Sequence, residues 1–313
     1  MAGLDLRLHP SAAAAGKVIL FGEHAVVHGA PALAAGLRDG LRLTATRADA
    51  PDAPTRLRIP AWDLDVLLEV DNPHPAARAA LAVLGHCDGP LRGHRIAGEA
   101  SIPARAGLGS SAALAVALAR LALGPACAAD DVLAAAHEGE RVFHGAPSGI
   151  DAQVASRGGL VRFDRASGSQ PLTGIRAFDL LVVPTGVPRD TSAQVEAVRD
   201  ALERHPRIIE PIVRSLGAAT EAAIVALRAG ELAVVGDLMN RSHHLLEALG
   251  VGHDALSELR RCALDSGALG AKLTGAGAGG CAIVLPEPSR VESTRSALLE
   301  KGWRPFDARI ESP

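Results

Sequence analysis

One acidic residue stands where an ordinary surface pattern would not put it. In a helical pattern, Glu140 shares a face with Leu133, Ala136 and Phe143, so its carboxylate is expected to point inward. An inward carboxylate needs a cation, a metal ion or dense hydrogen bonding, because burying an ionised group is costly. A structural ion pair and a metal site are the two interpretations of Glu140, and both stay open at this point.

Further groups able to do chemistry flank apolar segments. Asp151 ends the segment His144-Gly-Ala-Pro-Ser-Gly-Ile-Asp151, and on its own such a residue more often caps a turn or helix than catalyses. Lys17 begins the apolar run 17–21, where a solvated strand end or a snorkelling side chain is the ordinary interpretation. Glu23 and His24 follow closely. Such a polar cluster in a hydrophobic segment needs mutual contacts or a ligand.

A glycine-rich segment, residues 103–112, leads from an extended stretch into a helix that begins near Ser110 and Ser111. Unpaired backbone N–H groups and the positive end of the helix dipole meet there, and Gly107 and Gly109 allow an anion to approach the backbone closely. The segment predicts a phosphate-binding loop or, with about equal weight, a plain turn with a serine N-cap. It is not a Walker A loop, because no Gly-Lys-Ser/Thr follows.

A second glycine run covers residues 272–280 and contains a formal GxGxxG pattern. A strand-like run at 281–285 follows it instead of a helix, which argues against a dinucleotide-binding fold. A tight connection between strands and a loop on the substrate side stay open as alternatives. Arg189 precedes a helix start at Asp190 and Thr191, and its guanidinium is able to bind a carboxylate.

These residues need elements to position them. Extended segments are expected at 17–21, 25–27, 41–46, 95–102, 160–163, 178–184, 271–273 and 281–285, with the first two forming a hairpin. Helices are expected at 112–123, 130–143, 191–204, 208–228, 231–249, 254–266 and 291–301. Early strands followed by helices, without βαβ alternation, predict two α+β domains at 1–172 and 173–313, divided near the polar stretch 165–174.

Composition excludes several classes of function. The chain has 313 residues, a net charge of −3 and 2% aromatic residues with no Tyr, which argues against nucleic-acid and membrane partners. Neither a signal peptide nor an apolar stretch of membrane-spanning length is evident, so a soluble, cytoplasmic protein is expected. The four cysteines lie far apart and predict free thiols, with no metal-binding cluster at characteristic spacing.

Three segments together resemble the GHMP kinases. Residues 16–29 look like the family's first motif, residues 107–113 like its phosphate-binding second and residues 272–280 like its third, in family order. Within the superfamily, residues 22–29, 144–151 and 187–191 are most similar to the mevalonate kinases. The resemblance implies the two-domain GHMP kinase fold, with an N-terminal domain like the second domain of ribosomal protein S5 and a ferredoxin-like C-terminal domain.

The resemblance also implies roles for individual residues. Asp151 matches the catalytic aspartate, Lys17 the lysine near it and the substrate hydroxyl, and Ser111 and Glu140 the Mg²⁺ ligands. The ATP phosphates would lie against Ala106, Gly107, Leu108, Gly109, Ser110, Ser111 and Ala112. Mevalonate would be bound by Lys17, Glu23, His24, Asp151, Arg189, Thr191, Gly277 and Ala278.

The implied reaction is ATP-dependent phosphorylation of the 5-hydroxyl of mevalonate in isoprenoid precursor biosynthesis. The alternatives are another GHMP kinase, acting on phosphomevalonate, a sugar or homoserine, and a non-catalytic relative that binds ATP or a metabolite. The sequence does not set the oligomeric state, for which a homodimer is one expectation. With no Tyr in the chain, the residues around the adenine are not identified.

Overall fold

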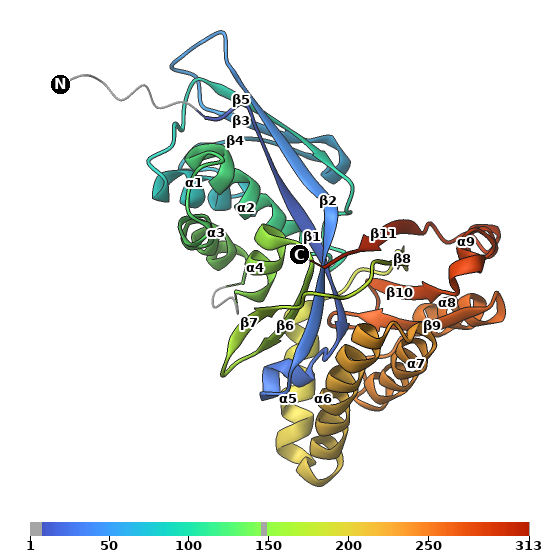
Figure 1. Ribbon diagram of the computed structural model, residues 1–313. Helices are drawn as coiled ribbons and strands as arrows, with labels where there is room; N and C mark the ends of the chain where they lie inside the picture. The colour runs from blue at the N-terminus through green and yellow to red at the C-terminus, as the bar shows by residue number, and fades with distance from the viewer. Residues whose placement is uncertain (1–7, 145–148, 313) are drawn as a thin grey trace. The chain divides into compact units, whose positions relative to one another are not determined.

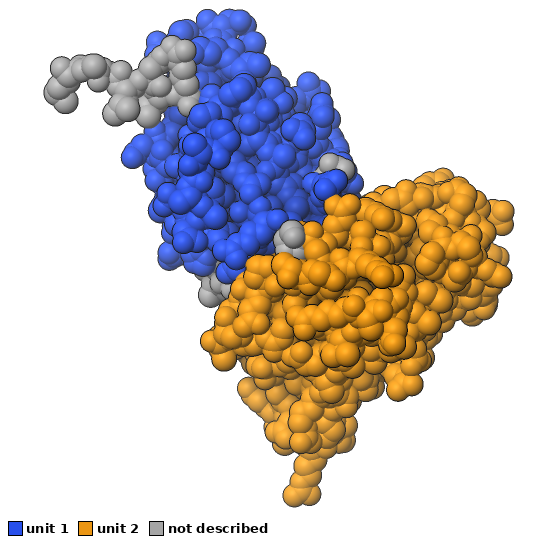
Figure 2. Space-filling view, in the orientation of Figure 1, with its two compact units in different colours: residues 1–17, 36–104, 108–158 blue, residues 18–35, 105–107, 159–313 orange. Residues whose placement is uncertain are grey.

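The computed structural model describes residues 8–144 and 149–312, and its chain forms two compact units (Figures 1 and 2). Unit 1 comprises the described residues within 1–17, 36–104 and 108–158, and unit 2 those within 18–35, 105–107 and 159–313. The units therefore interleave along the sequence. The division into domains 1–172 and 173–313 stays a prediction.

The elements follow one another along the chain as Figure 1 labels them. The strands are β1 (Ser11–Phe21), β2 (Ala32–Arg47), β3 (Arg56–Ile59), β4 (Leu64–Leu67), β5 (His94–Ala100), β6 (Leu160–Asp164), β7 (Gly168–Pro171), β8 (Phe178–Pro184), β9 (Ala268–Thr274), β10 (Cys281–Pro286) and β11 (Phe306–Ile310). The α-helices are α1 (Pro75–His86), α2 (Ser110–Leu123), α3 (Ala129–His144), α4 (Ile150–Arg157), α5 (Thr191–Arg204), α6 (Pro206–Ala229), α7 (Leu232–Ala248), α8 (Asp254–Asp265) and α9 (Val291–Glu300). Short 3₁₀ helices are η1 (Ala25–His28), η2 (Pro60–Trp62) and η3 (Pro288–Arg290).

In unit 1, strands and helices surround α2. β2 pairs antiparallel with β5 from Leu41 to Arg47, β5 pairs parallel with β3, and β3 pairs antiparallel with β4. Helices α1 and α2 pack on α3, and α4 packs on α2. Every residue of α2 from Ala112 to Ala119 is buried. The many alanines allow this close packing, since a small side chain lets neighbouring backbones approach one another.

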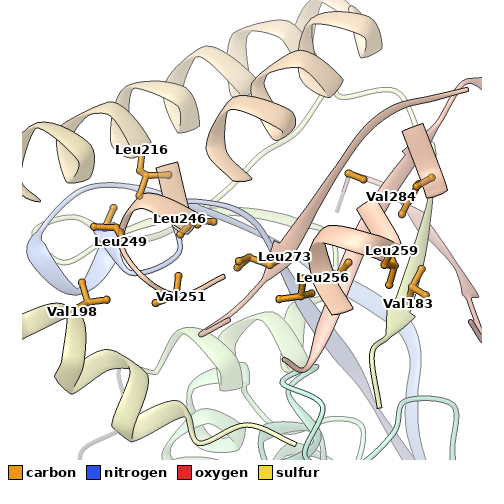
Figure 3. Close-up of a cluster of buried hydrophobic side chains, with 14 of the residues drawn as sticks. Val183, Val198, Leu216, Leu246, Leu249, Val251, Leu256, Leu259, Leu273 and Val284 are labelled. Atoms are coloured by element: carbon orange, nitrogen blue, oxygen red, sulfur yellow. The ribbon is translucent and has the colours of Figure 1, made fainter. Parts of the chain in front are cut away.

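In unit 2, the start of β2 pairs with β6, and β6 pairs with β7. A separate antiparallel sheet has the strand order β11-β8-β10-β9. This sheet forms a core with helices α5–α9, and Figure 3 shows aliphatic side chains such as Leu216, Leu246, Leu256 and Leu273 meeting there. Aliphatic residues fill this core, consistent with the shortage of aromatic residues in the sequence.

Most predicted elements are confirmed, but the predicted hairpin is wrong. Residues 25–27 belong to the 3₁₀ helix η1 and not to a strand, and β1 pairs instead with β2. Gly22, His24 and Gly29 have positive φ values of 88°, 57° and 87°. Left-handed residues bend the chain sharply, so the apolar run could not continue as an extended strand.

The predicted serine N-cap of α2 is also wrong. Gly109 is the N-cap residue, with φ 74° and ψ 29°, and no side chain caps this helix. Ser110 is already helical, which leaves its hydroxyl outside the capping position.

The four cysteines are free thiols, as predicted. Among the residues that the structure describes, no helix combines the length and the hydropathy needed to cross a bilayer.

Candidate active site

Lys17 and Asp151 form an ion pair in unit 1, with 2.9 Å between Nζ and Oδ1. Lys17 lies in β1 and its side chain is 8% exposed, whereas Asp151 lies in the first turn of α4 with its side chain 32% exposed. The carboxylate is thus accessible while its cationic partner is largely buried. Residues 145–148 of the motif that ends at Asp151 lie outside the described residues.

Glu140 is buried in α3, as its helical position predicted, and is 2% exposed. Its Oε1 accepts a hydrogen bond from the Ser111 hydroxyl at 3.5 Å. Burial and the nearby Asp151 carboxylate raise the pKa of Glu140 to about 7, against the opposing effects of Lys17 and Ser111. Among the described residues, no lysine or arginine forms an ion pair with Glu140 at contact distance, so the structural ion-pair interpretation finds no partner there.

The loop before α2 has the geometry of an anion site. The carbonyl of Gly109 accepts from the amide of Ala113 at 2.8 Å, which leaves the first-turn amides of α2 without intrahelical partners. Those N–H groups and the helix dipole favour a negatively charged ligand. The carbonyl of Leu108 accepts from the backbone amide of Lys17 at 2.8 Å, so the loop is held beside the ion pair within unit 1.

Unit 2 brings Glu23 and His24 together with the second glycine run. Glu23 and Lys272 form an ion pair in which both side chains are fully buried, and Lys272 also donates to the carbonyl of Leu273 at 2.7 Å. The Nε2 atom of His24 lies 3.0 Å from the carbonyl oxygen of Ala276. Burial lowers the pKa of His24, and the positive charge of Arg189 nearby adds to that effect, whereas the bond to Ala276 opposes it.

Arg189 reaches the same glycine run from the segment between β8 and α5. Its Nη1 donates to the carbonyl of Thr274 at 2.9 Å, and its side chain is half-buried. Asp190 caps α5 by accepting from the amide of Ala193 at 3.0 Å. Its carboxylate is therefore occupied in the helix cap, while Thr191 is exposed in the first turn.

Gly277 and Ala278 pack against the connection between α7 and α8. The amide of Ala278 donates to the carbonyl of Val251 at 2.8 Å, and a β-carbon on Gly277 would lie 2.2 Å from that same oxygen. Both residues have positive φ values, 75° for Gly277 and 53° for Ala278. The loop is therefore a fixed turn, and Gly277 is required for its path.

Sequence reasoning assigned no role to Lys272 beyond its place at the start of the glycine run. A lysine between the apolar residues of an expected strand was the available signal, because a buried ammonium group needs an acidic partner. Glu23 is 249 residues away in the sequence, so no local pattern could identify it.

Two family models match the chain. The model described as "GHMP kinases N terminal domain" matches residues 75–159, and "GHMP kinases C terminal" matches residues 223–303. These regions include α2, Glu140, Asp151 and the second glycine run.

Relatives match over nearly the whole chain. A mevalonate kinase from Aeropyrum pernix is 35% identical over 97% of each chain, and one from Mus musculus is 32% identical over 96% of this chain and 93% of its own length. The crystal structure of the L. major mevalonate kinase in complex with R-mevalonate superposes with a TM-score of 0.85 at 27% identity, covering 99% of both chains. The chain belongs to the GHMP kinase family, within the group of mevalonate kinases.

Proposed function

We propose that the chain transfers the γ-phosphoryl group of ATP to the 5-hydroxyl of mevalonate, giving 5-phosphomevalonate and ADP. The observation that carries the chemistry is the contact between Lys17 Nζ and Asp151 Oδ1 at 2.9 Å. The choice of mevalonate is supported by relatives of that name and by the L. major structure, which contains R-mevalonate. Membership of the GHMP kinases implies that ATP is the phosphoryl donor.

Phosphoryl transfer depends mainly on alignment and charge neutralisation. The accessible carboxylate of Asp151 would orient the 5-hydroxyl and accept its proton as the oxygen bonds to phosphorus and the bond to the ADP oxygen breaks. Lys17 would offset the charge that develops on the attacking oxygen and on the transferred phosphoryl group. Its burial keeps competing water away from that charge.

The ATP phosphates would lie against residues 106–112. The amides at the start of α2 donate to them, and the helix dipole favours their negative charge. Gly109 adopts φ 74°, which an ordinary side chain rarely allows, and a β-carbon there would lie 2.8 Å from Cγ of Lys17, so glycine lets the loop lie close to that lysine.

Glu140 and Ser111 fit a Mg²⁺ ion, because they are oxygen donors 3.5 Å apart and the carboxylate is buried beside a second acid. No group of three or more His, Cys, Asp or Glu at metal-binding distance occurs in the described part of the chain, which is compatible with a Mg²⁺ ion held mostly by phosphates and water. A bound Mg²⁺ ion would neutralise part of the negative charge on the ATP phosphates.

Mevalonate carries a carboxylate at the end opposite its reacting hydroxyl. Arg189 is the proposed partner of that carboxylate, since a guanidinium can donate two parallel hydrogen bonds to it. Thr191 would donate to another polar group of the substrate, and His24 would accept from a hydroxyl through Nδ1, because its Nε2 donates to the carbonyl of Ala276. Glu23, Gly277 and Ala278 are proposed to line the same subsite.

The homodimer and the cytoplasmic location also stay predictions.

ADP release tests this function. The purified chain with ATP and Mg²⁺ should release ADP with R-mevalonate and show at least about 10³-fold lower kcat/KM for phosphomevalonate, galactose and homoserine. Preference for one of those alcohols would replace mevalonate with another GHMP kinase substrate. ATP binding without ADP release on any of them would instead favour a non-catalytic relative.

A further inference from the structure

The guanidinium of Arg189 packs against glycines from two separate loops of unit 2. A β-carbon added to Gly107 would lie 1.4 Å from Nη2, and one added to Gly275 would lie 2.7 Å from Nη2 and 2.8 Å from Nη1. One added to Gly280 would lie 2.8 Å from Cδ and 3.1 Å from Nε. All of these distances are shorter than a normal van der Waals contact, so the three glycines together leave just the space that Arg189 occupies.

Hydrogen bonds fix the other side of this arrangement. Nη1 of Arg189 donates to the carbonyl of Thr274, whose own hydroxyl donates to the carbonyl of Ile19 at 2.9 Å and accepts from its amide at 3.1 Å. The segment that carries Arg189 is tied to the glycine run as well, because the amide of Gly280 donates to the carbonyl of Val187 at 3.0 Å. The carbonyl that accepts from Arg189 and the backbone segment that carries Arg189 are thus both held in place.

A methyl group at these positions would act mainly on Arg189. At Gly107 and Gly275 the atoms in the way are the outer end of a long, flexible side chain, which can swing aside without moving the backbone. The fold can therefore accommodate the substitution while the guanidinium cannot keep its place. A change of substrate affinity without a matching change of structure is the expected signature.

We propose that Gly107, Gly275 and Gly280 are positioning residues for Arg189, and that they set the affinity for the substrate carboxylate through it. This inference rests on the proposed function, in which Arg189 binds the carboxylate of mevalonate. Neither Gly275 nor Gly280 had a role in the sequence analysis, and Gly107 was assigned only to ATP. The glycines of the run 272–280 would therefore serve recognition of the substrate carboxylate in addition to shaping a turn.

Steady-state kinetics of Gly275→Ala provides the test, with Gly186→Ala as the matched control. Gly186 has φ +74° against +77° for Gly275, yet nothing lies within 4 Å of a β-carbon there. Both variants therefore carry the same backbone strain, and only one displaces Arg189. Gly280→Ala is the second variant, for use if Gly275→Ala does not fold. Each single variant is also made in the Arg189→Ala background.

We expect Gly275→Ala to raise the KM for mevalonate by roughly 10-fold or more, the scale of a lost charge-assisted hydrogen bond, with kcat and the KM for ATP within about 3-fold. Gly186→Ala should change none of these values. In the Arg189→Ala background, Gly275→Ala should add less than about 2-fold, because the group it displaces is already gone.

The failures of the two proposals are distinguishable. If Arg189→Ala raises the KM for mevalonate but Gly275→Ala and Gly280→Ala do not, the positioning role is overturned and the role of Arg189 stands. The positioning role is equally overturned if the glycine effect is the same size with and without Arg189. An unchanged KM in Arg189→Ala would remove Arg189 from the substrate site, and with it the functional part of this inference.

Discussion

Lys272 and Glu23 form an ion pair from which water is excluded, although 249 residues separate them in the sequence. The pair joins the segment that contains His24 to strand β9, at the start of the second glycine run. Burial lowers the pKa of Lys272, whereas the charge and hydrogen bond of Glu23 raise it. Each side chain therefore depends on the other to remain ionised inside the protein.

Removing one partner should cost far more stability than removing both. Lys272→Met leaves the Glu23 carboxylate buried without its cation and should lower the free energy of unfolding by about 3–5 kcal/mol. The double variant Glu23→Leu with Lys272→Met should recover most of that loss, because apolar residues of similar size need no counter-charge. Urea unfolding followed by circular dichroism measures both values.

Arg199→Ala is the control for this pair. Arg199 lies 2.9 Å from Glu196, but the two side chains are 56% and 66% exposed, so its removal should change stability by less than about 1 kcal/mol. A double variant as unstable as Lys272→Met would show that the pair itself, and not the avoidance of an isolated charge, stabilises unit 2.

Most helices and strands of unit 2 could be predicted from the sequence. The helix expected at 191–204 is α5, and the expected strand at 281–285 is β10 with one further residue. These segments have clear periodicity and end at Gly, Pro or capping residues. Helix α4 and strands β3 and β4 were not predicted, because they are short. Helix α1 was missed although its buried residues, among them Ala76, Ala80 and Val83, recur at helical spacing.

The site was predictable where a single helix decides the direction of a side chain, as for Glu140. Contacts between distant segments were not predictable in that way. The proximity of Lys17 to Asp151 rested on family resemblance alone, since β1 and α4 share no local pattern. The N-cap of α2 was assigned to serine because serine commonly caps helices, whereas the chain uses a left-handed glycine and needs no side-chain cap.

Gly109→Ala should lower kcat as well as weaken ATP binding. A β-carbon at this position would lie 2.8 Å from Cγ of Lys17, which is buried and so has little room to move. Displacing the Lys17 ammonium group by about 1 Å costs on the order of 10²-fold in rate. Measured kcat at saturating ATP separates this effect from a loss of ATP affinity.

The control for that variant is Gly158→Ala in the same unit. Gly158 also has a positive φ, +65°, and nothing lies within 4 Å of a β-carbon there. The Gly158→Ala variant should have a slightly lower free energy of unfolding and an unchanged kcat. If Gly109→Ala at saturating ATP retains the kcat of the unaltered protein, contact with Lys17 has no part in its effect.

Glu140→Gln should make the metal-free protein less sensitive to pH. The pKa of Glu140 is raised from 4.5 to about 7, so the folded state holds this proton more tightly than the unfolded state. The stability that results is fully present below about pH 4.5 and is lost as pH rises through about 7. Over that window the loss is about 3 kcal/mol, and Glu140→Gln should abolish it.

Urea unfolding in EDTA at pH 4.5, 6 and 8 measures this difference. The variant should gain stability relative to the unaltered protein as pH rises, and it should need at least about 10-fold more Mg²⁺ for half-maximal activity. A stability difference that stays constant with pH would contradict the raised pKa. An unchanged Mg²⁺ requirement would remove Glu140 from the metal site.

Asp151→Asn and Lys17→Met should each lower kcat by at least about 10²-fold, while ATP binding, measured by calorimetry, stays within about 3-fold. In the proposed function both groups act on the same hydroxyl, and they lie 2.9 Å apart, so the double variant should lose much less than the product of the two single losses. Multiplicative losses would mean that the two residues act independently. Near-normal kcat in Asp151→Asn would be the more serious result, because it would leave Lys17 as the one catalytic group of the pair and require another base for the hydroxyl proton.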